Sequence, residues 1–206
     1  MKSLAALGNR IANVRESRNM TQEKLASLAG YSERTIRKAE TSKPVSLQTL
    51  CDIATALEIE LGEILPPSVY QEIVEPNRAV VEATLNAIVS KDIDGIIRRI
   101  TDDIVFWYSG PAELPYAGTH KGKAEVRKSF EISLGIYEWI EEPIYDAWIV
   151  TYDHVVVHGH DKVRVIANGV TFMSQWSVFF QIRNGLICQI RHYADQTVPL
   201  KAINSD

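Results

Sequence analysis

Long hydrophobic runs are missing from this chain of 206 residues. No stretch approaches the ~20 apolar residues that a helix needs to cross a bilayer, and the amino-terminal residues lack the apolar core of a signal peptide. Cysteine is scarce too, because only Cys51 and Cys188 occur, without the spacing of a metal site. Internal repeats and low-complexity tracts are also lacking. We therefore expect a cytoplasmic protein without a disulfide, rather than a membrane or disulfide-framed one.

The net charge of −4 hides an uneven distribution. Residues 1–43 carry nine Lys or Arg against four Asp or Glu, whereas the remainder of the chain carries thirteen against twenty-two. An acidic bulk disfavours indiscriminate coating of nucleic acid, so a basic region at one end can act locally on phosphate.

Residues 21–40, TQEKLASLAGYSERTIRKAE, predict two short helices joined by a sharp turn. Thr21 is a suitable N-cap for the first helix, and Gly30 follows its last apolar position, where a left-handed C-cap suits glycine. Ser32 is a suitable N-cap for the second helix. The outward face of the second helix is polar and consists of Glu33, Arg34, Arg37 and Lys38. Such a face could bind DNA, but an outward polar face is also common on helices that never touch DNA.

Further helices are predicted on either side of this pair. Pro44 ends the region of the second helix, and Ser46 can cap a helix with an apolar face. Residues 60–65 add one turn before two prolines. Residues 1–67 should form an all-α, five-helix domain, followed by a linker over residues 68–76. The first helix is amphipathic, because apolar residues recur at steps of three, four and three: Leu4, Leu7, Ile11 and Val14.

Residues 4–65 resemble the Cro/cI-type, lambda-repressor-like helix-turn-helix domain of the xenobiotic-response-element (XRE) family of transcriptional regulators. The motifs are the LASLAG turn, the S-x-x-T-I-x-K-x-E helix and the SLQTLCDIATAL helix. The resemblance implies that Gln22 clamps a phosphate, whereas Glu33, Arg34 and Lys38 reach base edges.

Other positions follow from the same resemblance. Thr41 and Lys43 should contact the DNA backbone and so position the domain without reading sequence. Ser32 should cap the helix and contact a base or phosphate. Arg15 and Glu40 match a partly buried ion pair with a structural role. The DNA-binding set is Gln22, Ser32, Glu33, Arg34, Arg37, Lys38, Thr41 and Lys43. Ser42 departs from the family, which often has glycine there, so a left-handed turn at Ser42 would be modestly strained.

From residue 77 onwards, the pattern predicts helices followed by strands. Helices are expected over residues 77–89, 93–100 and 122–134, and a first strand over residues 104–109. The apolar period then becomes two, and Asn184-Gly185 predicts a tight hairpin. This order predicts an α+β cone in which a curved, mainly antiparallel sheet wraps around the helices. The long strands are expected over residues 144–152, 155–165, 171–183 and 186–193.

Residues 77–198 resemble the SnoaL-like group of the nuclear-transport-factor-like, ketosteroid-isomerase-like superfamily, which leaves residues 199–206 as a tail. The resemblance rests on KDIDGIIRRITDDIVFW, PYAGTHKGKAEVRKSF and QWSVFFQIRNGLICQIRHYAD. It implies an apolar cavity between sheet and helices. In polyketide cyclases of this group an Asp matching Asp195 acts as acid or base, and burial beside aromatic rings would raise its pKa. Candidate cavity residues are Trp107, Tyr116, His120, Trp176, His192, Tyr193 and Asp195.

Histidines suggest a rival interpretation. His158-Gly-His160 places two imidazoles on one strand face, and His154 shares their parity. Cupin barrels, often fused to similar DNA-binding domains, contain a His-x-His metal pair. The glutamate that should follow is missing, however, and Arg164 stands there instead. We therefore expect neither a metal nor a cofactor.

Together, these patterns predict a sequence-specific transcriptional regulator. The first domain should bind a palindromic operator in double-stranded DNA, and the second should bind a small hydrophobic effector and pair two protomers. We expect a homodimer, because two recognition helices about 34 Å apart match half-sites one turn apart. No enzymatic activity is expected. Two alternatives stay open: a SnoaL-like cyclase or isomerase using Asp195, with a DNA-binding domain attached, and an antitoxin-like regulator with a protein partner.

Overall fold

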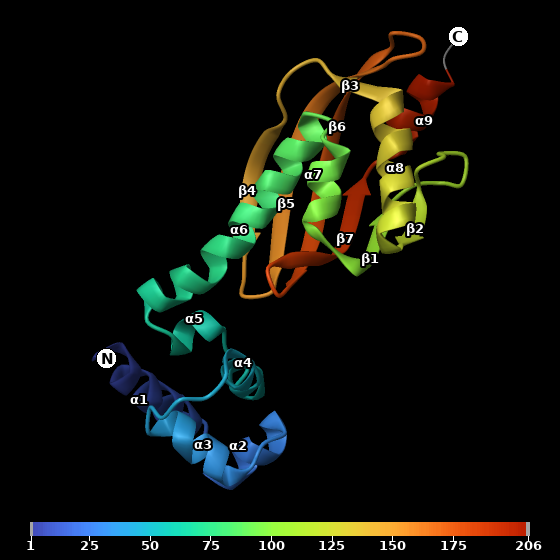
Figure 1. Ribbon diagram of the computed structural model, residues 1–206. Coiled ribbons are helices and arrows are strands. Elements are labelled where there is room, and N and C mark those ends of the chain that lie inside the picture. Colours follow the sequence, from blue (N-terminus) through green and yellow to red (C-terminus); the bar gives the residue numbers. More distant parts are fainter. Residues whose placement is uncertain (1, 205–206) are drawn as a thin grey trace. The chain divides into compact units, whose positions relative to one another are not determined.

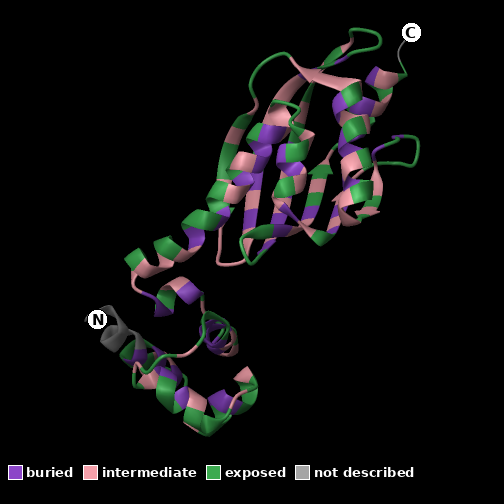
Figure 2. Cartoon of the chain, in the orientation of Figure 1, coloured by how far each residue is buried: buried purple, intermediate pink, exposed green. Residues whose placement is uncertain are grey.

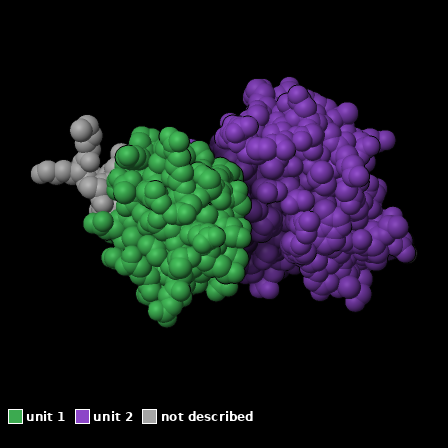
Figure 3. Space-filling model, turned by 90° about the horizontal axis from the view of Figure 1, so that it is seen from below, with its two compact units in different colours: residues 1–73 green, residues 74–206 purple. Residues whose placement is uncertain are grey.

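The computed structural model describes the backbone of residues 2–204 and the side chains from Gly8 onwards. The predicted inward positions of Leu4 and Leu7 lie outside the described side chains. The chain forms two compact units, residues 1–73 and residues 74–206 (Figure 3). We call them the amino-terminal unit and the carboxy-terminal unit. Among the helices described, none has the length and apolar character needed to span a membrane.

The amino-terminal unit is all helical, as predicted. Its polar caps stand where the sequence indicated: the Thr21 hydroxyl accepts from the backbone N–H of Lys24 at 3.1 Å, and Gly30 has a φ of 73°. Apolar side chains from several helices are fully buried and form its core, among them Ile11, Leu25 and Ile36. The helices are α1 (Lys2–Ser17), α2 (Gln22–Ala29), α3 (Glu33–Glu40), α4 (Leu47–Ala56) and α5 (Leu61–Ile64).

Helix α1 makes a close approach to the end of α3 at Gly8. A Cβ atom added at Gly8 would lie 2.1 Å from the carbonyl oxygen of Glu40. The backbone N–H of Gly8 donates to the Ser42 hydroxyl at 3.1 Å, and Ser42 has a left-handed φ of 56°. The strain expected at this non-glycine residue is therefore offset in part by a hydrogen bond that glycine could not accept.

The segment predicted as a linker is helical. Helix α6 (Pro67–Val89) runs through residues 68–76 without a break and contains Pro76, which has no N–H for the helix ladder. Pro67 is well placed at the first helical position, where a missing N–H costs nothing. The buried Asn77 side chain donates to the carbonyl oxygens of Thr151 at 3.1 Å and Tyr152 at 2.8 Å. These bonds tie α6 to the carboxy-terminal unit.

The carboxy-terminal unit contains a seven-stranded, curved sheet with the order β2-β1-β7-β6-β5-β3, and β4 also pairs with β5. Its pairings are antiparallel except that of β1 with β7, which confirms a mainly antiparallel sheet. The strands are β1 (Ile100–Tyr108), β2 (Gly118–Lys121), β3 (Tyr137–Trp139), β4 (Ile144–Val150), β5 (His154–Val165), β6 (Thr171–Arg183) and β7 (Leu186–Ala194).

Helices α6, α7 (Ile93–Arg98) and α8 (Gly122–Ile136) cover the same face of this sheet (Figure 1). Buried residues recur on the helix sides and strand positions that face one another (Figure 2). The α+β cone predicted from the order of helices and strands is thus observed. Its core contains Val81, Leu85, Ile96, Ile104, Val126, Phe130, Val157, Val178, Phe180 and Ile190.

Three details differ from the expectation. Ile100 begins β1 instead of ending a helix, because its fully buried side chain belongs to the sheet core. The short strands β2 and β3 were not predicted. Residues 199–203 belong to α9 (Thr197–Ile203) rather than to a tail, and its Pro199 and Ala202 are buried.

Replacing Gly8 with alanine should destabilise the amino-terminal unit by about 1–3 kcal/mol, since the new methyl group meets a backbone carbonyl that cannot rotate away. Calorimetric unfolding of the full chain measures this loss. Gly62→Ala in α5 is the matched control, because its added Cβ has its nearest neighbour, in the Tyr70 ring, at 3.6 Å. Equal stability of both variants and the parent would contradict the close approach of α1 and α3.

Candidate DNA interface and candidate ligand cavity

The outward face of α3 is open to solvent. Glu33 and Arg37 form an ion pair of 2.5 Å across one helical turn. The exposed side chains of Arg34 and Lys38 have neither a hydrogen bond nor an ion pair with any described residue. These two cations are therefore available to a base edge or a phosphate, whereas Glu33 must first separate from Arg37.

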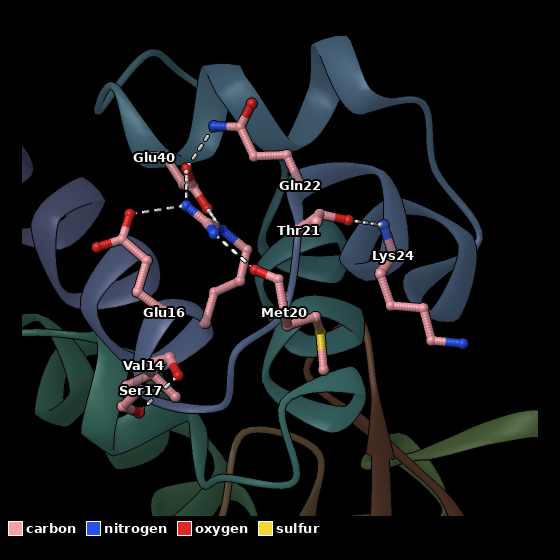
Figure 4. A network of polar contacts seen from close by, with 9 residues as sticks. Val14, Glu16, Ser17, Met20, Thr21, Gln22, Lys24 and Glu40 are labelled. Carbon is pink, nitrogen blue, oxygen red and sulfur yellow. Dashed lines mark hydrogen bonds and ion pairs between the residues drawn. The ribbon is translucent and has the colours of Figure 1, made fainter.

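A nearly buried carboxylate, that of Glu40, joins the first three helices. Arg15 donates from Nε to Oε1 at 2.5 Å and from Nη2 to Oε2 at 3.2 Å, so the ion pair expected between them is present. The Arg15 side chain is 10% exposed and the Glu40 side chain is 6% exposed. The Gln22 amide points at Glu40 and donates to Oε2 at 2.6 Å (Figure 4). Gln22 therefore has a structural bond, which leaves its second N–H for the expected phosphate.

Hydroxyls at both ends of α3 serve as caps. Ser32 Oγ accepts from the backbone N–H of Thr35 at 3.3 Å, and Thr41 Oγ1 donates to the carbonyl oxygen of Arg37 at 2.7 Å. Lys43 lies just beyond, exposed, with no side-chain partner among the described residues. The ends of the helix are thus fixed, and Lys43 is the cation that follows it.

An apolar cavity of about 140 Å³ lies inside the carboxy-terminal unit. Helices α6 and α8 contribute aliphatic and aromatic side chains to its wall, and the concave side of the sheet contributes most of its rings. Of the cavity residues predicted from the sequence, Tyr116, Trp176 and His192 line it.

Trp107, Tyr193 and His120 are not among the residues that line the cavity in the described structure. The rings of Trp107 and Tyr193 contact each other at 5.0 Å between centroids, beside Val105 and Arg191 in a separate depression. His120 Nε2 lies 2.9 Å from the carbonyl oxygen of Tyr116. Their assignment as cavity residues is corrected accordingly.

Asp195 also lies outside the cavity lining. Its exposed carboxylate accepts from the hydroxyl of Thr197 at 2.7 Å and from the Thr197 backbone N–H at 2.9 Å, at the start of α9. These hydrogen bonds lower the pKa of Asp195. The burial that would suit this carboxyl for proton transfer is therefore missing, and its hydrogen bonds are local, to Thr197.

Asp161 is a carboxylate in the cavity wall that the sequence pattern did not predict. Strand β5 alternates, so Val157, Gly159, Asp161 and Val163 point to the concave side, and Asp161 lines the cavity. Trp139 Nε1 donates to its Oδ2 at 3.1 Å. Burial raises the pKa of Asp161, whereas the side chains of Trp139 and Trp176 act to lower it. The alternating valines of β5 were the signal that could have found it.

One polar atom without a partner stands in the cavity wall. His192 Nδ1 is buried and has no hydrogen bond with any described residue, whereas the Trp176 side chain interacts with Asp161. Burial lowers the pKa of His192 to about 4, so this ring is neutral at pH 7. Nearby, the hydroxyls of Tyr116 and Tyr137 lie 2.7 Å apart. An apolar ligand with few polar atoms would suit such a wall.

The histidines of β5 point to the opposite side from Asp161. His158 Nδ1 lies 3.0 Å from Ser177 Oγ, and His160 Nδ1 lies 2.9 Å from Asp146 Oδ2. Within the described residues, no group of three or more His, Cys, Asp or Glu could hold a metal ion. The pattern of a cupin metal pair is therefore accounted for by local hydrogen bonds.

Together these features define a helix-turn-helix unit joined to an α+β unit with an internal cavity. Family models agree: the helix-turn-helix model matches residues 11–64, and the SnoaL-like domain model matches residues 81–190. The chain belongs to the SnoaL-like family and carries an XRE-type helix-turn-helix domain at its amino terminus.

Solved structures match the carboxy-terminal part of the chain. An NTF2-like protein from Burkholderia xenovorans is 25% identical with a TM-score of 0.56, covering 64% of this chain and 98% of that one. TerC, co-crystallised with polyporic acid, is 21% identical (TM-score 0.56, coverage 63% and 99%). An LEH-like epoxide hydrolase from M. tuberculosis is 18% identical (TM-score 0.51, coverage 63% and 90%). The last two show the fold alone. No curated protein sequence matches the chain.

The neutral His192 predicts a pH-dependent stability. The folded pKa of about 4 lies below the ordinary 6.5, so the unfolded chain binds more protons between these values, and stability falls as pH falls through this window. We expect a loss of about 1–2 kcal/mol between pH 6.5 and pH 5 that His192→Gln lacks. Denaturant titrations of both proteins at several pH values measure it. Parallel pH profiles would contradict burial of a neutral ring.

Proposed function

We propose that this protein is a sequence-specific transcriptional regulator that binds an operator as a dimer and an effector in its internal cavity. The observation that carries the first part is the pair of unpartnered cations, Arg34 and Lys38, on the exposed face of α3 in an XRE-type domain. A guanidinium group that forks onto a guanine discriminates against other bases by roughly 1–3 kcal/mol.

The proposal contains no catalytic step. Asp195 accepts from Thr197 outside the cavity wall, and its lowered pKa favours the anion rather than a group that exchanges protons near neutral pH. The cavity instead offers apolar contact with a few isolated polar atoms, which supports binding.

Arg34→Ala should remove sequence preference, because the base contact is lost while the phosphate contacts remain. We expect the ratio of affinities for a selected operator and a scrambled duplex to drop by roughly 10-fold or more. The operator is first selected from random duplexes with the full chain, and affinities follow from fluorescence anisotropy at fixed salt.

Lys43→Ala distinguishes positioning from reading. It should weaken binding to the operator and the scrambled duplex alike and reduce the salt dependence by about one counterion. Lys128→Ala is the matched control, since this exposed lysine lies on α8 in the other unit. Preserved sequence preference in Arg34→Ala would exclude α3 as the reading helix.

Dimerisation is supported by the sheet face opposite to helices α6, α7 and α8. Helices α6, α7 and α8 lie on one side of the sheet, and a row of cross-strand neighbours crosses the other: Ile149, Val156, Phe179, Arg191 and Trp107. Ile149 is 63% exposed and Met173 is 53% exposed. We propose that a second copy covers this face, since two reading helices are needed for a palindromic operator.

Ile149→Glu should shift the protein from dimer to monomer, because it places a carboxylate in the apolar part of the proposed interface. Its side chain is mostly exposed within one chain, so folding of the monomer should be retained. Sedimentation velocity over a range of concentrations measures the change. Ile166→Glu, at a residue 49% exposed in the β5–β6 turn, is the control. A dimer that survives Ile149→Glu unchanged rules out this face.

A further inference from the structure

Asp161 is the only carboxylate among the cavity-lining residues that the structure describes, and neither lysine nor arginine lines the wall with it. The lining histidine, His192, is neutral at pH 7. The Asp161 carboxylate therefore faces the cavity without a counter-cation there, and its side-chain partners are the indoles of Trp139 and Trp176. Such a group is costly to ionise, and an anionic ligand would raise the cost further.

Aromatic rings bracket this carboxylate along β5. Gly159 pairs with Trp176 of β6 and with Tyr145 of β4, and Val163 pairs with Trp139 of β3. Asp161 lies between these positions on the same side of the strand. Two rings, those of Tyr145 and Trp176, approach to 5.9 Å between centroids. The carboxylate thus has an indole on one side and an indole with a phenol on the other.

Gly159 makes room for this arrangement. A Cβ at Gly159 would lie 2.8 Å from Cη2 of Trp176, so a side chain there would displace the indole. Trp176 is 7% exposed, and its side chain interacts with the Asp161 carboxylate, which acts to lower the pKa of that group. The indole is therefore held beside the carboxylate in the cavity wall.

We propose that the cavity binds a small organic cation, a protonated amine or quaternary ammonium. The cation pairs with Asp161 and contacts the rings of Trp139, Trp176 and Tyr145. Ammonium groups bind favourably over the faces of tryptophan and tyrosine, most strongly where water is excluded. The organic cation would be the effector of the proposed regulator. Only its effect on regulation rests on the proposed function; its binding to the cavity does not.

Two probes of matched shape test the charge requirement. Choline carries a quaternary nitrogen and a hydroxyl, and 3,3-dimethylbutan-1-ol replaces that nitrogen with a neutral carbon. We expect the full chain to bind choline roughly tenfold or more tightly than the neutral alcohol in titration calorimetry. Equal affinities, tighter binding of the alcohol, or no binding of choline would each overturn the proposal.

Asp161→Asn should remove the preference for choline and leave the affinity for the neutral alcohol within about threefold. Asp146→Asn is the matched control, because this partly exposed carboxylate pairs with His160 on the other side of the sheet. An unchanged preference in Asp161→Asn would overturn the assignment of the cation subsite. If that variant does not fold, the comparison of the two probes on the parent protein decides alone. These titrations contain no DNA, so their failure and the failure of operator recognition are separate results.

Discussion

The Glu40 carboxylate is the contact on which the geometry of the amino-terminal unit depends. It ends α3 and receives Arg15 from α1 and Gln22 from α2. Because both charges are nearly out of water, loss of either partner would cost about 3–5 kcal/mol. At Gly8, the backbone of α1 also lies close to the backbone carbonyl of Glu40, at the same end of α3. The exposed cations of α3 therefore stand on a helix fixed at its carboxyl end.

Asp161 is the counterpart of Glu40 in the carboxy-terminal unit. The two carboxylates differ in whether a cation lies beside them, and this difference sets their roles. The guanidinium of Arg15 compensates Glu40, which makes that carboxylate a structural joint. Asp161 has the indoles of Trp139 and Trp176 beside it and no cation in the cavity wall, so burial raises its pKa and leaves its charge uncompensated. The same functional group thus holds a fold together in one place and leaves a binding requirement open in another.

Local signals carried the successful predictions. Caps at Thr21, Ser32 and Gly30, and the hairpin at Asn184-Gly185, depend on neighbouring backbone and so can be read from sequence. Short strands and the start of β1 depend on distant pairing partners, which periodicity does not reveal. In the site, side chains that are adjacent in a strand point to opposite faces of the sheet. His192 and Tyr193 are adjacent in β7, so both could not face one cavity.

Regulation by the proposed route requires a ligand that binds the DNA-competent arrangement with a different affinity from the other arrangement. Helix α6 is suited to transmit such a difference, because it starts at Pro67 in the amino-terminal unit and carries cavity residues such as Leu85 and Ile88 in the other. Asn77 anchors the same helix to two backbone carbonyls. Coupling of this kind is reciprocal, so operator binding would change the affinity for the cation by the same factor.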